Sequence, residues 1–181
     1  MKWLYLLKRR ENSLPVVLGL VDGILTAMLL TARKILGYGT PVDSGIALKV
    51  AIYAFATAGF VFYIGRYAEL RSQLVHAAAQ LNLRKKGKLA TTYLGRTVLH
   101  EAVREAFISG GSSFVSALLP LSLAALFPFI PQLSILVSIF LLGLLGFVIG
   151  RAVRGSSLLW SVNLVLGGLF MTVLGFGLHI M

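Results

Sequence analysis

The sequence predicts an all-α membrane protein, with five transmembrane helices and a short helical cytoplasmic segment between helices two and three. Composition is the first observation: of 181 residues, 57% are hydrophobic and 13% are charged, and the mean hydropathy is +0.88. A soluble domain usually carries about 25% charged residues, so an ordinary globular protein is excluded. The second observation is a set of five apolar windows close to the roughly 20 helical residues that cross a bilayer. These windows cover residues 14–36, 45–65, 106–127, 133–150 and 157–180.

The apolar windows are expected to be helices because they are continuous and do not alternate every second residue, as barrel strands do. The first window is too long for the apolar region of a signal peptide, and no small-x-small cleavage site follows it. We therefore expect this window to be retained as the first span.

Basic residues lie at the ends of the spans, which explains the net charge of +11 without nucleic-acid binding. One side of the predicted membrane holds Lys2, Lys8, Arg9 and Arg10, then Arg66, Arg71, Arg84, Lys85, Lys86, Lys88, Arg96 and Arg104, and finally Arg151 and Arg154. The other side holds Arg33, Lys34 and Lys49. Because positively charged short loops stay cytoplasmic, the N-terminus is expected inside and the C-terminus outside. In a prokaryote the host membrane is expected to be the cell membrane.

Residues 66–105 are the only sizeable polar segment of what we expect to be a single polytopic domain covering residues 1–181. Apolar spacing predicts a helix over 66–82. A basic turn follows at 84–88, and a second helix is expected from about Thr91 into the third span. The turn is expected to be attracted to anionic lipid, at about 1 kcal/mol per cation.

Asp22 is the sharpest candidate for chemistry. It lies about eight residues into the first span, or roughly 12 Å below the cytoplasmic boundary at 1.5 Å per residue. A carboxylate at such depth costs about 2.5–3.5 kcal/mol, which favours a cation site, a proton carrier or a buried partner. Thr26, one turn later, offers a further oxygen ligand. The structural alternative is a protonated carboxyl bonded to Thr26 or to a facing carbonyl. Lys49 is about 14 Å away along the membrane normal, too far for an ion pair.

Small and hydroxylated residues accompany Asp22. Gly19 and Gly23 flank it as a Gly-x-x-x-Gly pair that permits close approach of a second helix. The third span carries Ser-Gly-Gly-Ser-Ser at 109–113, then Ser116 and Pro120. Because Pro120 has no N–H to donate, this stretch predicts an oxygen-lined polar track. Ordinary packing of small residues with a proline bend is the alternative.

Glu101 and Glu105 are one turn apart and would face the same way on the helix before span three, beside His100. Two such carboxylates could capture a divalent cation from the cytosol. Glu69 and His76 join them if the two helices of the polar segment pack together. Alternatively, the glutamates pair with Arg104 or with the basic turn. His179 is expected to be an interfacial residue.

No pattern supports an enzyme. The chain lacks a Gly-x-Ser-x-Gly elbow, a P-loop and a His-Glu-x-x-His motif. It contains no cysteine, which excludes disulfides, thiolate metal sites and thiol catalysis. No cofactor is expected.

Three stretches resemble the vacuolar iron transporter family, which comprises five-span Fe(II) and Mn(II) transporters. Residues 19–25, Gly-Leu-Val-Asp-Gly-Ile-Leu, are similar to that family's Gly-Leu-x-Asp-Gly-Leu pattern. Residues 65–73 resemble its Gly-x-Tyr-x-x-x-x-Ser-Gln exit from span two. Residues 113–121 resemble its Ser-Phe-x-x-Gly-x-x-x-Pro-Leu stretch in span three.

The resemblance implies proton-coupled export of Fe2+ or Mn2+ from the cytosol through a homodimer, with Asp22 in the membrane metal site. Family members place an acid and a methionine in span two, where this chain has Ala54 and Phe62. The family's Glu-rich cytoplasmic bundle is reduced here to a basic segment. Two alternatives therefore stay open: a non-transporting membrane interaction protein of the same fold, and an exchanger for another cation.

Overall fold

The computed structural model describes residues 13–35, 43–80, 93–127, 130, 132–153 and 155–177, and within them every regular element is a helix. The all-helical expectation is confirmed. The helices are α2 (Ser13–Ile35), α3 (Ser44–Gln80), α4 (Tyr93–Leu126), α5 (Gln132–Ala152) and α6 (Ser157–Gly177).

Four of these helices, α2 to α5, are long and apolar enough to cross a membrane. Their apolar portions cover Ser13–Ala32, Ser44–Ala77, Gly95–Leu126 and Gln132–Ala152. The described apolar portion of α6 is shorter, Ser157–Val173. The chain therefore has the helices of a multi-pass membrane protein.

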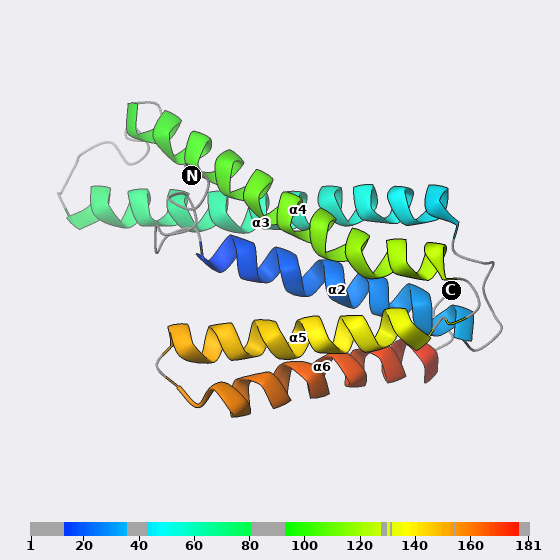
Figure 1. Ribbon diagram of the computed structural model, residues 1–181. Helices are drawn as coiled ribbons and strands as arrows, with labels where there is room; N and C mark the ends of the chain where they lie inside the picture. The colour runs from blue at the N-terminus through cyan, green and yellow to red at the C-terminus, as the bar shows by residue number, and fades with distance from the viewer. Residues whose placement is uncertain are drawn as a thin grey trace, which may run out of the picture.

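Helix α2 lies between two helix pairs (Figure 1). On one side α3 and α4 form the most extensive helix contact of the described chain, and α2 packs against α4. On the other side α5 and α6 form a hairpin that also contacts α2. The first of the described helices is thus the centre of the bundle.

Helices α3 and α4 are far longer than one membrane crossing requires. They contain 37 and 34 residues, whereas a hydrocarbon core of about 30 Å needs roughly 20. The helix predicted over 66–82 is continuous with the second span as far as Gln80, and the helix predicted from Thr91 is continuous from Tyr93 through the third span. The basic turn at 84–88 lies outside the described residues, as do the N-terminal cations and His179.

Small side chains form much of the interior, together with a second buried cluster of Ile24, Met28 and Leu142, whereas many large apolar side chains cover the outside. One buried cluster consists mainly of alanines from α2, α3 and α4: Ala27, Ala47, Ala51, Ala54, Ala117 and Ala124, with Leu121. Outside, Tyr53, Phe60 and Phe107 are about two-thirds exposed, at 66%, 65% and 64%. Small residues at helix contacts and apolar ones outside are the arrangement expected in lipid, where close helix packing supplies the association energy.

The α5–α6 hairpin illustrates this packing. A Cβ at Gly146 would lie 2.5 Å from the Cα of Ser161, and a Cβ at Gly150 would lie 2.5 Å from the Cα of Ser157. The hydroxyl of Ser161 also donates to the carbonyl of Gly143 at 2.8 Å. Only glycine permits so close an approach of the two backbones.

Buried hydroxyls join three helices near Pro120, which lies inside α4 without ending it. Ser134 of α5 donates to the Pro120 carbonyl at 2.7 Å, and its oxygen lies 3.2 Å from the hydroxyl of Thr31 in α2. Both hydroxyl residues are fully buried. These bonds fix α2, α4 and α5 relative to one another.

Candidate functional site

Asp22 lies in the middle of α2, nine residues after Ser13, or about 13 Å along the helix axis. Its side chain is exposed in the single chain. One carboxylate oxygen, Oδ2, accepts a hydrogen bond of 3.0 Å from the hydroxyl of Ser113 in α4. The structure thus brings together an acid of the first predicted span and a serine of the third.

The two glycines beside Asp22 explain why Ser113 can reach it. A Cβ on Gly19 would overlap the carbonyl oxygen of Ser109, and a Cβ on Gly23 would overlap the hydroxyl of Ser116 and the carbonyl of Ser113. Helices α2 and α4 therefore cross in backbone contact. The second helix expected at the Gly-x-x-x-Gly pair is α4.

Thr26 lies one helical turn after Asp22, but its hydroxyl does not bond the Asp22 carboxylate. Its hydroxyl donates to the backbone carbonyl of Asp22 at 2.9 Å. Among the described residues, the hydroxyl of Ser113, 91 residues away, bonds the Asp22 carboxylate. The sequence offered a carboxyl bonded to Thr26 as the structural alternative to a cation site. In the structure the carboxylate is bonded by Ser113 instead. The Thr26 oxygen still has a lone pair that could bind an ion.

The other serines of the expected polar track bond mainly to their own helix. Ser112 donates to the carbonyl of Ile108 at 2.8 Å, and Ser116 donates to that of Ser113 at 3.2 Å. Ser109, Ser113 and Ser116 are all buried. Among these serines, Ser113 alone is seen to bond a carboxylate of another helix in the described chain.

No cation accompanies Asp22 among the described side chains. The ion pairs found there all involve Arg66, and Lys49 makes none with Asp22. Within the same residues, no three His, Asp or Glu side chains are arranged to hold a metal ion. One chain therefore offers a single carboxylate with hydroxyl oxygens nearby, which is an incomplete ligand set for a divalent ion.

The second cluster of acids lies where α3 and α4 pack together, and Arg66 is at its centre. Its guanidinium Nη1 lies 3.0 Å from Oε2 of Glu69, Nη2 lies 3.5 Å from Oε1 of Glu101, and Nε lies 2.8 Å from Oε2 of Glu105. The side chain of Glu105 is 4% exposed, against 56% for Glu69. We call these four residues the Arg66 cluster.

The Arg66 cluster contains all three glutamates that the sequence suggested for metal capture. They come together because the helices pack, but a guanidinium lies where a captured cation would lie. The ion-pair alternative named Arg104 and the basic turn as partners. Arg66 makes the ion pairs seen among the described residues, the charge of Arg104 also acts on Glu105, and the basic turn lies outside the described residues. A sequence signal was present: Arg66 and Glu69 are three residues apart, and Glu101 and Glu105 are four apart, on helices with opposite directions.

His76 and His100 are exposed and belong to no metal-holding group within the described residues. Ala54, which replaces the acid that the resemblance places in span two, is buried in the alanine cluster with Ala27 and Ala117. Phe62 is half-buried. Neither position adds a ligand to the Asp22 site.

Comparison with protein-family models, with curated proteins and with solved structures gave no match. The likeness to the vacuolar iron transporters therefore depends on the three sequence stretches, two of which form the Asp22–Ser113 crossing.

Proposed function

We propose that this chain is a divalent transition-metal transporter, with Asp22 as its membrane cation site and Fe2+ or Mn2+ as cargo. The observation that carries the proposal is the state of Asp22. Its carboxylate lies at span depth, one oxygen is held by Ser113 at 3.0 Å, and the side chain is open on the surface of the chain. An intramembrane acid without a partner cation is a functional site by default.

Two copies of the chain would complete the ligand set. One carboxylate supplies one negative charge, and a divalent ion is best balanced by two. The exposed face of α2 carries Leu18 one turn before Asp22 and Leu14 two turns before it. A two-fold dimer through this face would cover the leucines and bring both carboxylates together, because such an interface uses the same surface twice.

Proton coupling follows from the cost of charge in lipid. An empty carboxylate at this depth is expensive, whereas a neutral or paired side chain is not. Asp22 would therefore alternate between a metal-bound carboxylate and a neutral acid. Each metal ion that leaves is replaced by protons, which supports proton-coupled export from the cytosol.

The test is flux in proteoliposomes with a panel of Mn2+, Fe2+, Ca2+ and Na+. Asp22→Asn removes the charge and keeps the shape, so flux of Mn2+ and Fe2+ is expected to be lost. Asp43→Asn is the matched control, because Asp43 is an exposed aspartate directly before α3. Equal flux in the two variants would overturn the proposal, and flux confined to Na+ would favour the exchanger for another cation.

A non-transporting interaction protein is the second candidate, and the Ser113 bond is the observation that favours it. The close crossing of α2 and α4 already gives Asp22 one partner, as a purely structural acid would require. Absence of flux for every ion in the wild-type protein, with Asp22→Asn folded and assembled normally, would support this candidate.

A further inference from the structure

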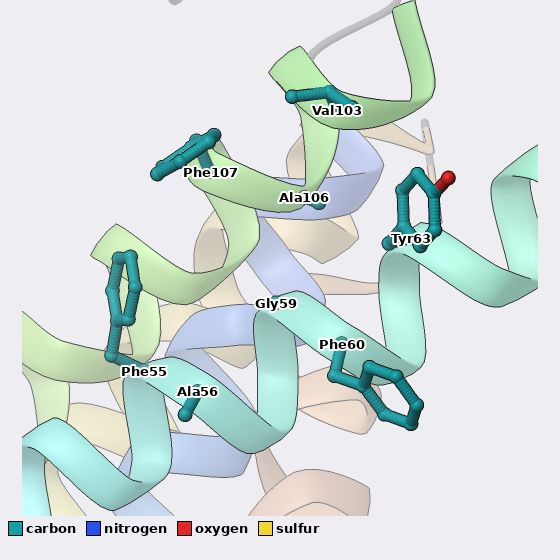
Figure 2. Close-up of a pocket in the computed structure, with 8 residues that line it drawn as sticks. All are labelled: Phe55, Ala56, Gly59, Phe60, Tyr63, Val103, Ala106 and Phe107. Carbon is teal, nitrogen blue, oxygen red and sulfur yellow. The ribbon is translucent and has the colours of Figure 1, made fainter. Parts of the chain in front are cut away.

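An apolar groove of about 250 Å³ lies between α3 and α4. Figure 2 shows the small residues Gly59 and Ala106 between the two helices, with Phe55 and Phe107 on one side and Tyr63 on the other. The rings of Phe55 and Phe107 are tilted at 54° with centroids 6.2 Å apart. Small side chains at the base thus leave a hollow that aromatic rings enclose.

The groove opens onto the outer surface of the helix bundle. Phe60 and Phe107, which line it, are mostly exposed, and both helices are long and apolar enough to cross a membrane. Since a water molecule occupies about 30 Å³ in the liquid, the groove has room for about eight groups of that size. A run of methylenes fits an apolar hollow of this volume.

A strip of aromatic and basic side chains leads away from the groove along α3. Phe60, Tyr63, Tyr67 and Arg71 recur at three- and four-residue spacing and so share one face. The rings of Tyr63 and Tyr67 stack at 5.9 Å, and the Arg71 guanidinium lies 6.0 Å from the Tyr67 ring centre. Arg71 Nη1 also donates to the Tyr67 hydroxyl at 3.5 Å.

Arg71 has a charge available for an external anion. It is exposed, and no carboxylate pairs with it among the described side chains. Glu69, its neighbour in sequence, is bonded to Arg66. The guanidinium therefore differs from that of Arg66, which three carboxylates surround.

The distance along α3 between the groove and Arg71 is comparable to the thickness of half a bilayer. Counting from Arg66, the first charged residue after the apolar run, Arg71 lies about 7.5 Å outward and Gly59 about 10 Å inward at 1.5 Å per residue. The polar layer of each leaflet is about 5–7.5 Å thick. Arg71 is thus at phosphate depth when the groove is at acyl-chain depth, with the two tyrosines between them.

We propose that an anionic glycerophospholipid binds this surface, with one acyl chain in the groove and its phosphate on Arg71. Tyr63 and Tyr67 then lie beside the glycerol and ester region, where amphipathic rings are favoured. Charge complementarity selects an anionic headgroup such as phosphatidylglycerol over phosphatidylcholine with the same chains. The site is separate from Asp22 and does not depend on transport.

Native mass spectrometry of the full chain in detergent tests this with equal amounts of phosphatidylglycerol and phosphatidylcholine. The wild-type protein is expected to retain phosphatidylglycerol preferentially. Arg71→Gln is expected to reduce that preference about fivefold, since one cation near anionic lipid is worth about 1 kcal/mol. Ala56→Leu, at an exposed position of the groove, and Gly59→Leu are expected to reduce retention of both lipids.

Arg151→Gln is the matched control, because Arg151 also lies over an aromatic ring, 4.9 Å from that of Phe147, but on α5. It is expected to leave the preference unchanged. Equal retention of the two lipids by the wild type would overturn the proposal, as would wild-type behaviour of Arg71→Gln or Ala56→Leu. Equal competition by glycerol phosphate would indicate a free-phosphate site instead. A dimer that Ala56→Leu dissociates, without bound lipid, would indicate that a second copy fills the groove.

Discussion

Asp22 and the Arg66 cluster both place carboxylates at helix contacts, but the groups that bond these carboxylates differ. The three glutamates of the cluster share one guanidinium within the same chain, at 2.8–3.5 Å. Asp22 has a neutral hydroxyl at 3.0 Å and, among the described side chains, no cation. The Arg66 cluster thus has a cation within the same chain, whereas the Asp22 site needs a proton, an ion or a second copy.

The largest expected effect comes from removing the central cation. Arg66→Gln leaves three carboxylates together without their guanidinium, so the free energy of unfolding should fall by about 3 kcal/mol, the lower end for a broken buried pair. Denaturant unfolding in detergent measures this. Mn2+ should restore part of the loss in the variant and have little effect through these glutamates in the wild type. A variant as stable as wild type, with no response to Mn2+, would show that Arg66 does not hold the cluster.

The next largest effect on stability is expected at the crossing of α2 and α4, where Gly23 lies beside Asp22. Gly23→Ala places a methyl group against the Ser113 carbonyl and the Ser116 hydroxyl, so the free energy of unfolding should fall by about 2 kcal/mol from overpacking. Gly65→Ala is the control, because a Cβ there meets no atom within 4 Å. That control should gain about 0.5–1 kcal/mol, the cost of glycine within a helix. Equal effects of the two substitutions would contradict the close crossing.

Asp22→Asn should change stability in the opposite direction to Arg66→Gln. The amide is neutral, and its carbonyl oxygen can still accept the hydrogen bond from Ser113. Because a charged side chain is costly at span depth, the free energy of unfolding should rise by about 1 kcal/mol when it is measured without metal at a pH high enough to ionise Asp22. Asp43→Asn should leave it unchanged. A marked loss of stability in Asp22→Asn would assign the carboxylate a structural role.

The smallest expected effect on stability distinguishes the contribution of the Ser113 hydroxyl from that of the Asp22 carboxylate. Ser113→Ala removes one interhelical hydrogen bond, worth about 0.6 kcal/mol on average in membrane proteins. Ser122→Ala is the control, since the Ser122 hydroxyl bonds only the Leu119 carbonyl of its own helix. If Ser113 also orients Asp22 for an ion, apparent Mn2+ affinity should weaken in Ser113→Ala alone. Identical affinity in the two variants would limit Ser113 to packing.

The apolar runs predicted the helices well because span length is a local property of the sequence. Helices α2 to α5 begin within a few residues of the expected windows or, for α4, of the expected helix from Thr91. For α4 the sequence predicted one helix from the polar segment into the third span, and the structure confirms it. For α3 the sequence did not show that the second span and the helix predicted over 66–82 form one helix. The charged residues of 66–105 indicate where a span is expected to end. They do not indicate where the helix ends, because helix continuity depends on the backbone. No proline or pair of glycines interrupts the helix at 65–66.

The site was predicted in parts. Burial cost identified Asp22, and small-residue spacing identified the Gly19–Gly23 contact. Its partner Ser113 required the register between α2 and α4, which depends on tertiary packing of segments about 90 residues apart. Arg66 was counted only as one of the cytoplasmic cations for the same reason. Its three carboxylates come from two helices whose relative register is set by the packing of α3 against α4.

The most direct measurement is the infrared difference spectrum of the reconstituted protein, with aspartate isotope-labelled, on addition of Mn2+. Our account predicts loss of a protonated carboxyl band and gain of a carboxylate band. Both should be absent in Asp22→Asn and present in Asp43→Asn. A wild-type spectrum unchanged by Mn2+, or one that Asp22→Asn reproduces, would contradict the account.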